Sequence, residues 1–145
     1  MAQTGSRNDP FGAFNFLVEI EGVTIAGFSE VTGLSNETDV IEYRTGDHEN
    51  TVTKLPGLKK FGNITLKHGL TDNTELWEWR KTVMDGKTVR KALSIVLNNE
   101  AGQEAVRWNL YEAWVRKYDI SAFNGKGNEV LLETVELVTE KVELA

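Results

Sequence analysis

The chain of 145 residues contains no cysteine, which excludes disulfides, thiolate metal sites and cysteine nucleophiles. Side chains that titrate near neutral pH are also scarce, since the two histidines, His48 and His68, lie in different segments. Basic residues are in deficit, with 16 Lys and Arg against 22 Asp and Glu and a net charge of -6. This balance argues against binding to a nucleic-acid backbone, which needs a surplus of positive charge.

Long apolar runs are missing as well. No stretch approaches the roughly 20 residues that cross a bilayer, and the first residues lack the apolar core of a signal peptide. We therefore expect a chain that is made in the cytoplasm without a signal peptide and does not insert into a membrane by itself. Residues 1–10 are small and polar and predict a flexible arm. Because no linker or repeat follows, residues 11–145 are expected to form a single domain.

Strand periodicity dominates the rest of the chain. The turn Glu21-Gly22 is typical of a hairpin between two strands. Residues 45–60 are the least regular segment, with one possible short strand over 50–55 and a turn at Leu55-Pro56-Gly57. Alternating polar and apolar residues predict strands over residues 14–20, 23–31, 37–44, 61–70, 89–97, 105–115 and 129–144.

The last of these predicted strands is unusually long. Residues 129–144 would form one strand of about sixteen residues, where five or six are typical. Apolar side chains occur on both of its faces, and no proline interrupts it. On a sheet edge such a strand would be an aggregation hazard. We therefore expect that neighbouring copies pair with it or that a closed barrel removes the edge.

One helix is expected over residues 72–85. Asp72 can cap it, Glu75 completes a capping box, and Gly86 ends it. Four apolar residues fall on one face at helical spacing: Leu76, Trp79, Val83 and Met84. One helix beside six or seven strands predicts a mostly β fold, a two-sheet β-barrel or sandwich whose helix covers an opening or an edge.

The residues give little support for catalysis. Neither histidine has a second ligand at metal spacing; we expect His68 on the surface at a strand end and His48 at a solvated loop tip. No serine lies in a G-x-S-x-G turn. No helix is expected after Gly125-x-Gly127, which is typical of a turn between strands rather than of a phosphate-binding loop. We expect no catalytic residue, no metal and no cofactor.

Two groups of residues leave alternatives open. The C-terminal glutamates could form a paired carboxylate site, but a solvated or channel-lining face is the simpler interpretation for Glu129, Glu133, Glu136, Glu140 and Glu143. The tryptophans could stack on sugars or bases. Because basic residues are not interleaved with them, we expect core or interface packing for Trp77, Trp79, Trp108 and Trp114.

From Phe11 onward the chain carries a series of distinctive segments: Phe14 to Gly22, Ala26 to Leu34, Glu42 to Gly46, Lys54 to Leu58, Asn63 to Lys67, Leu76 to Trp79, Val96 to Gly102, Trp108 to Leu110 and Gly127 to Val130. In this order they resemble the phage tail-tube family of contractile systems over nearly the whole chain. The likeness is greatest to the inner-tube protein of extracellular contractile injection systems, the phage-tail-like particles of bacteria. Two positions depart from the family pattern: Val115 stands where a proline is frequent, and Thr139 where a histidine is common.

The resemblance implies a hexameric ring whose copies form a 24-stranded inner barrel around a channel. Stacked rings would make a tube inside a contractile sheath, which drives the tube through a target envelope as part of a phage-tail-like particle. The sequence leaves open whether this particle is cytoplasmic, anchored to a membrane or released from the cell. The implied partners are further copies of the chain, the sheath, baseplate or tube-initiator proteins, a tail terminator, and effector cargo in the lumen. The implied role is structural, not enzymatic.

Two other classes remain open alternatives. One is a secreted hexameric ring that carries or chaperones effectors, as related ring proteins of type VI secretion do. The other is a monomeric β-barrel that binds a small molecule, which would need an enclosed apolar cavity.

Three sets of residues follow from the resemblance. The loop over 45–60 would reach the adjacent ring through Gly46, Asp47, His48, Glu49, Asn50, Thr51 and Lys54. The helix over 72–85 would face the sheath through Asp72, Glu75, Glu78, Lys81 and Asp85. Polar faces of the inner strands would line the lumen through Asn63, Thr65, Lys67, Thr134, Glu136 and Glu140. Since the chain is acidic, we expect a neutral to acidic lumen.

Overall fold

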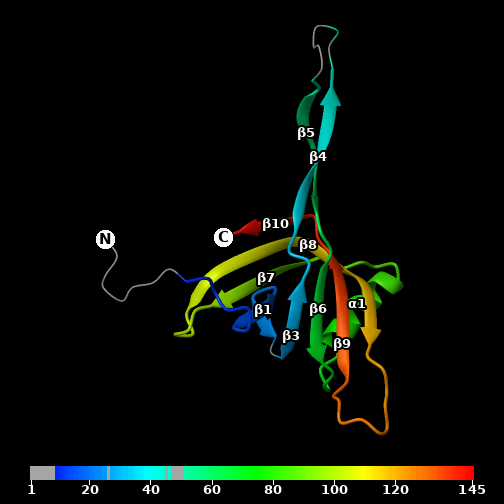
Figure 1. Cartoon of the computed structure of the whole chain (residues 1–145). Helices are drawn as coiled ribbons and strands as arrows, with labels where there is room; N and C mark the ends of the chain where they lie inside the picture. The colour runs from blue at the N-terminus through cyan, green and yellow to red at the C-terminus, as the bar shows by residue number, and fades with distance from the viewer. Residues whose placement is uncertain (1–8, 26, 45, 47–50) are drawn as a thin grey trace, which may run out of the picture.

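The computed structural model describes residues 9–25, 27–44, 46 and 51–145. Within these ranges the chain is mostly β, with ten strands and one helix (Figure 1). The elements are β1 (Phe16–Ile20), β2 (Val23–Ile25), β3 (Phe28–Thr32), β4 (Asn36–Tyr43), β5 (Thr53–Phe61), β6 (Ile64–Gly69), α1 (Glu75–Met84), β7 (Lys91–Asn98), β8 (Glu104–Ile120), β9 (Leu132–Val138) and β10 (Lys141–Leu144).

The described strands form two sheets in which all pairs are antiparallel. The larger sheet has eight strands in the order β2-β1-β7-β8-β9-β6-β3, and β10 pairs with β8 beside this path. The smaller sheet is the pair β4-β5. Because β2 and β3 end the order of the larger sheet, the described strands of one chain do not close into a barrel.

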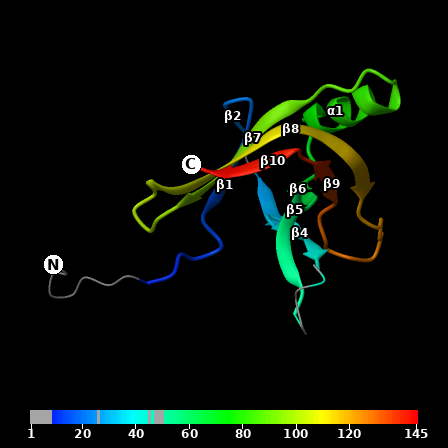
Figure 2. The same cartoon turned by 90° about the horizontal axis from the view of Figure 1, so that it is seen from above.

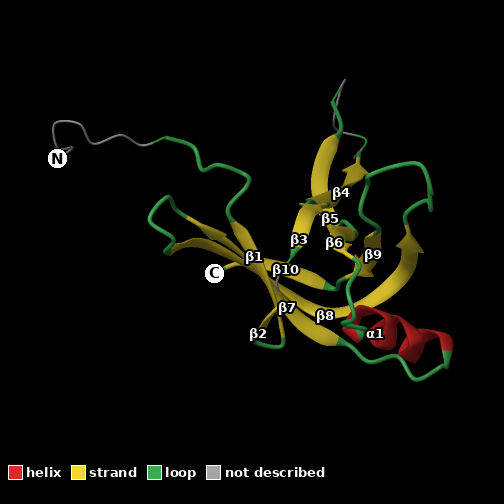
Figure 3. Cartoon of the chain, turned by 90° about the horizontal axis from the view of Figure 1, so that it is seen from below, coloured by secondary structure: helices red, strands yellow, loops and turns green. Residues whose placement is uncertain are grey.

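β8 connects the two parts of the larger sheet. Its first part pairs with β7 and β10, and its second part, residues 114–120, pairs with β9. Between them Glu112 has a left-handed backbone with φ 54, and the register with β7 shifts. The sheet folds over itself there into what we call the β7 half-sheet (β2, β1, β7, β10 and the first part of β8) and the β6 half-sheet (the second part of β8, β9, β6 and β3) (Figures 2 and 3).

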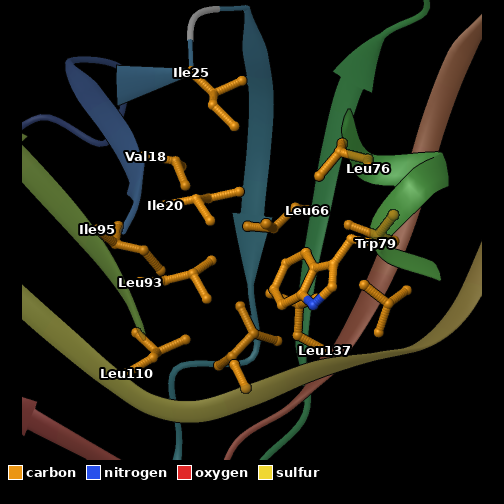
Figure 4. Packing of buried hydrophobic residues seen from close by; sticks show 14 residues of the cluster. Val18, Ile20, Ile25, Leu66, Leu76, Trp79, Leu93, Ile95, Leu110 and Leu137 are labelled. Carbon is orange, nitrogen blue, oxygen red and sulfur yellow. The ribbon is translucent and has the colours of Figure 1, made fainter. Parts of the chain in front are cut away.

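The hydrophobic core lies between these two half-sheets (Figure 4). Every second side chain of a strand points to the same face, so the alternation in the sequence becomes one buried and one exposed face. β6 shows this directly, since buried and half-buried residues alternate along it. The core residues of the β7 half-sheet include Val18, Ile20, Leu93, Ile95 and Leu110, and those facing them include Ile64, Leu66, Val135 and Leu137.

α1 packs its Leu76 and Trp79 into this core and contacts β8. The helix ends as predicted at Gly86, whose φ of +78 suits a residue without a Cβ. The predicted cap at Asp72 is wrong, because the N-cap residue is Thr74 and makes no side-chain cap bond. Instead Asn73 accepts a hydrogen bond from the Glu75 N–H at 2.9 Å. The predicted apolar face is also partly wrong, as Met84 is 52% exposed.

β4 and β5 form a hairpin that projects from the body of the molecule (Figure 1); we call it the β4–β5 arm. The turn predicted at Leu55-Pro56-Gly57 is wrong, because these residues lie inside β5. Pro56 pairs with Val40 next to a register shift. A proline is tolerated there because an arm of two strands consists of edges only. The segment predicted as irregular is therefore largely a paired strand.

The C-terminal segment predicted as one long strand is two strands, β9 and β10, with residues 129–131 outside them. They are separated at Thr139-Glu140, where their common partner β8 bends. Within the described sheet the longest strand is β8 itself, with 17 residues.

The strand predicted over 23–31 is likewise two strands, and β2 and β3 stand at opposite ends of the sheet order. Gly27, with φ +88, lies between them and allows the chain to change direction.

Candidate assembly surfaces

The β6 half-sheet carries a polar face on the side away from the core. Its register pairs Thr65 with Glu136 and Lys67 with Thr134, so four predicted lumen residues lie side by side. Asn63 joins them, because its amide donates to a Glu136 carboxylate oxygen at 3.4 Å. The structure thus brings five of the six candidates together on one surface.

The sixth candidate, Glu140, lies apart in the break between β9 and β10. Its N–H donates to the carbonyl of Tyr111 at 3.1 Å, so its backbone belongs to the bend and not to the ladder of β6 and β9.

Charges on the polar face are balanced. Three ion pairs each join one acidic to one basic side chain: Lys67–Glu30, Arg116–Glu136 and Lys117–Asp119. These groups are largely exposed, so each pair stabilises the fold by at most about 1 kcal/mol. Their importance is that the surface has no excess of either charge within this set.

The sequence-based prediction missed the contribution of β8 to this surface, because it ended that strand at Val115. The signal was present, since polar and apolar residues continue to alternate through Lys117, Tyr118 and Asp119 to Ile120.

A buried polar cluster lies behind the polar face. His68 is 6% exposed and its Nδ1 lies 3.3 Å from a carboxylate oxygen of Glu133, which is 1% exposed. The Tyr118 hydroxyl donates to the other carboxylate oxygen, and the ring of Phe28 lies 4.9 Å from that of His68. Burial, followed by the hydrogen bond to Glu133, raises the pKa of Tyr118. The predictions that His68 lies on the surface and that Glu133 is solvated are therefore wrong.

The β6 half-sheet has two edges without a strand partner among the described residues. β3 pairs only with β6, and residues 114–120 of β8 pair only with β9. Arg80 of α1 donates to the Val115 carbonyl at 3.0 Å, and most residues after it in β8 are exposed. Free strand edges are templates for pairing with another chain. Since three antiparallel steps separate β3 from β8, the two edges run in opposite directions.

The β4–β5 arm has no core beneath it. Val40, Tyr43 and Leu58 are 62%, 53% and 74% exposed, and a two-stranded ribbon alone is only marginally stable in water. Of the predicted stacking residues, Asp47, His48, Glu49 and Asn50 lie outside the described residues. Gly46, Thr51 and Lys54 are exposed, and Lys54 pairs in register with Glu42.

The arm continues the strands of the β6 half-sheet, since β3 leads into β4 and β5 into β6. Gly33 and Gly62 make the close crossing at its base possible. A Cβ on Gly33 would lie 2.0 Å from the Asn63 carbonyl oxygen, and one on Gly62 would lie 2.2 Å from the Ser35 hydroxyl. The Gly62 N–H donates to the Ser35 carbonyl at 3.0 Å.

The predicted sheath-facing residues of and around α1 are all exposed: Asp72, Glu75, Glu78, Lys81 and Asp85. Within the helix they share one face: at about 100° per residue, Glu75, Glu78 and Lys81 follow one another at intervals of three residues. Lys81 also lies beside Trp77, which is four residues before it.

No group of three or more His, Asp or Glu side chains in the described ranges could hold a metal ion. Among the same residues, no helix is long and apolar enough to cross a membrane. What the surface offers is strand edges, an exposed arm and a polar sheet face, which define a β-rich assembly subunit.

The comparisons with known proteins agree with this class. The family model of the T4-like virus tail tube protein gp19 matches residues 12–143, and the chain belongs to this family. A comparison with curated proteins finds no match. The family membership confirms the resemblance drawn from the sequence.

Solved structures extend the comparison. The chain is similar to a protein in the tube-terminating cap of the anti-feeding prophage, with 27% identity, a TM-score of 0.87 and coverage of 100% of this chain and 99% of that one. It is also similar to a protein in the sheath-tube complex of the extracellular contractile injection system PVC, with 28% identity, a TM-score of 0.84 and coverage of 94% and 91%. Hcp1 from Flavobacterium johnsoniae, at 20% identity, TM-score 0.56 and coverage of 91% and 95%, shares the fold.

The chain is thus a tube protein of the kind found in contractile injection systems and phage tails. The family and the similar structures are structural tube proteins, not enzymes. The family and the TM-scores of the injection-system proteins favour this class over the effector-carrier alternative.

Proposed function

We propose that the chain forms the wall of the inner tube of a phage-tail-like particle, as hexameric rings that stack. One observation carries this proposal: the β6 half-sheet presents four antiparallel strands with a free edge on each side. Four strands from each of six copies make the 24-stranded barrel. Because the number per copy is even, the β3 edge of one copy meets the β8 edge of the next in antiparallel orientation, all around the ring.

Ring closure would remove both free edges, which is how barrels avoid uncontrolled pairing. Ring closure also decides which face of the β6 half-sheet would point outward and which would point into the channel. The apolar face is already covered by the β7 half-sheet, which would lie outside. The polar face, with Thr65, Lys67, Thr134 and Glu136, would line the lumen. Its balanced ion pairs support a neutral bore, to which cargo of either charge would adhere weakly.

Stacking would use the β4–β5 arm. Since β4 and β5 continue two strands of the proposed barrel, the arm would extend past the rim of its own ring toward the next. There its exposed Val40, Tyr43 and Leu58 could be buried. The predicted contact residues, from Gly46 to Thr51 and Lys54, would meet the adjacent ring.

The outer partners follow from the same arrangement. α1 would present Asp72, Glu75, Glu78, Lys81 and Asp85 to the sheath as a mainly acidic surface. The structures that resemble the chain come from sheath-tube, baseplate and tube-terminator assemblies. We therefore infer contacts with a sheath, a baseplate or tube initiator and a terminator, and effector cargo inside the tube of an extracellular particle.

A thiol cross-link tests the ring closure, because the chain has no cysteine of its own. Glu30→Cys and Lys117→Cys in one chain place one thiol on each free edge. Treated with a short bis-maleimide, assembled protein should give a ladder of covalent species that ends at the hexamer. Glu30→Cys alone is the control and should give no ladder, because each joint then carries only one thiol. A double-edge variant that assembles but does not cross-link between copies would contradict the closure.

A further inference from the structure

The core of one copy is open on two sides, beside β3 and beside the second part of β8. We propose that Trp77 on α1 of one copy packs into an apolar groove beside β3 of the neighbouring copy in the ring. This inference rests on the proposed ring and names the side chains that seal its joints. It makes one face of α1 a contact between copies, while Glu75 and Glu78 remain directed outward.

The groove has a volume of about 410 Å³, enough for an aromatic side chain. Phe16, Val31 and Trp108 line it and also pack against the core, so the groove is an open side of the core. Phe11 and Leu34 form its rim and are 56% and 38% exposed. Apolar surface of this kind next to a free strand edge is typical of a protein–protein contact.

The opposite opening carries the complementary side chain. Trp77 is 40% exposed, and its ring stands edge-on against that of Tyr118 at 5.3 Å. Met84, seven residues further along α1, lies on the same helix face and is 52% exposed. Two large exposed apolar groups thus lie on one face of α1, and one of them, Trp77, lies against Tyr118 of the β8 edge.

The strand register connects the two openings. Tyr118 pairs with Val135, Val135 with Leu66, and Leu66 with Val31. All four side chains belong to the core or pack against it, so they form one apolar row across the half-sheet. When the β8 edge of the next copy adds to β3, its Tyr118 extends this row past Val31. Its Trp77 then stands over the groove.

Barrel closure staggers neighbouring strands, and a stagger by an even number of residues keeps each side chain on its own face. The groove accommodates such a shift because its lining follows the chain from Ser29 to Leu34. Aromatic side chains that fill a neighbour's pocket are frequent energetic centres of an interface. The seal at each joint would also keep water out of the core.

The test is a double-mutant cycle with Trp77→Ala and Leu34→Ala, made singly and together, in the full chain. Glu78→Ala, adjacent on α1 but on another face, is the control. Sedimentation and negative-stain microscopy give the protein concentration at which half of the chain is assembled. We expect each single change to raise this concentration about tenfold or more, and the control to leave it within about twofold.

If the two side chains meet across the joint, the double variant should be little worse than either single variant. If the double variant instead raises the assembly concentration by the product of the two single effects, the two side chains do not interact and the inference is overturned. Normal assembly of Trp77→Ala would also overturn it. Either result would leave the ring proposal intact. Failure of the wild-type chain to form rings or tubes would overturn both. Circular dichroism of the variants separates loss of assembly from loss of folding, since both side chains are exposed in the single chain.

Discussion

The hydroxyl of Thr139 donates to the carbonyl oxygen of Tyr111 at 2.8 Å, across the place where β8 and its C-terminal partner both bend. The N–H of Glu140 donates to the same oxygen at 3.1 Å. Tyr111 precedes Glu112, whose left-handed backbone starts the second part of β8. The two strands therefore leave one half-sheet and enter the other together, and Thr139 holds the angle between the half-sheets.

Replacement of Thr139 by valine keeps the side-chain shape and removes the donor. Thr139 is 6% exposed, so Thr139→Val should lower the free energy of unfolding by about 1 kcal/mol. Urea titration followed by circular dichroism measures this. Thr24→Val on the exposed strand β2 is the matched control and should change stability by less than about 0.5 kcal/mol. Equal losses in both variants would show that the bond at the bend contributes nothing specific.

Replacing Gly33, at the base of the β4–β5 arm, should lower the stability of the chain much more than replacing Gly22, in the hairpin between β1 and β2. Gly33 and Gly22 both have positive φ, but a Cβ on Gly33 would lie 2.0 Å from a backbone oxygen and one on Gly22 would touch nothing. Gly22→Ala should cost about 1 kcal/mol, from the backbone conformation alone. Gly33→Ala should cost distinctly more, as measured by thermal unfolding. Similar costs for both would contradict the close crossing.

The Tyr118 hydroxyl should stabilise the chain below about pH 10 and lose this effect in alkali. Burial and the Glu133 carboxylate raise its pKa, so the folded chain keeps a proton that the unfolded chain releases. The stabilisation is complete below the unfolded pKa and is lost as the pH rises through the folded one. At neutral pH, Tyr118→Phe should cost about 1–3 kcal/mol because buried Glu133 loses a donor. The gap between the variant and the wild type should narrow above about pH 10.

Tyr43→Phe, on the exposed arm, is the control for this pH series. It should follow the wild type from neutral to alkaline pH. A Tyr118→Phe chain whose deficit stays constant above pH 10 would show that this hydroxyl does not titrate as its burial requires.

Shortening the β4–β5 arm should separate folding from stacking. Residues 39–58 are replaced by an Asn-Gly turn that joins Thr38 to Lys59, which already pair. The shortened chain should unfold like the wild type, since β4 and β5 make most of their contacts with each other, and should form rings without long tubes. Electron microscopy measures tube length. Tubes of normal length from this variant would refute the stacking role.

Period-two alternation in the sequence placed Thr65 and Lys67 on one face of their strand and Thr134 and Glu136 on one face of theirs, because that pattern depends only on residues two apart. The structure adds that the two strands are neighbours, so the four side chains meet on one surface. The same local rule failed for Glu133, which looked solvated. Its partner His68 is 65 residues away, and a local pattern cannot show such a partner.

The free edges could not be predicted from the sequence either, because an edge is defined by the order of strands in the sheet. Residues 129–144 form two strands instead of the one long strand predicted, and the partners of these strands, β8 and β6, belong to the same chain. Within the β6 half-sheet, the described edges that remain open are β3 and residues 114–120. The strands that support assembly are therefore β3 and residues 114–120, and not residues 129–144, from which assembly was predicted.

The central claim is that copies of this chain close edge to edge around a channel. Negative-stain electron microscopy of the purified wild-type chain, over a series of rising concentrations, tests it most directly. The account predicts hollow rings with sixfold symmetry and tubes built from them. Monomers at every concentration, or filaments without a central channel, would contradict it.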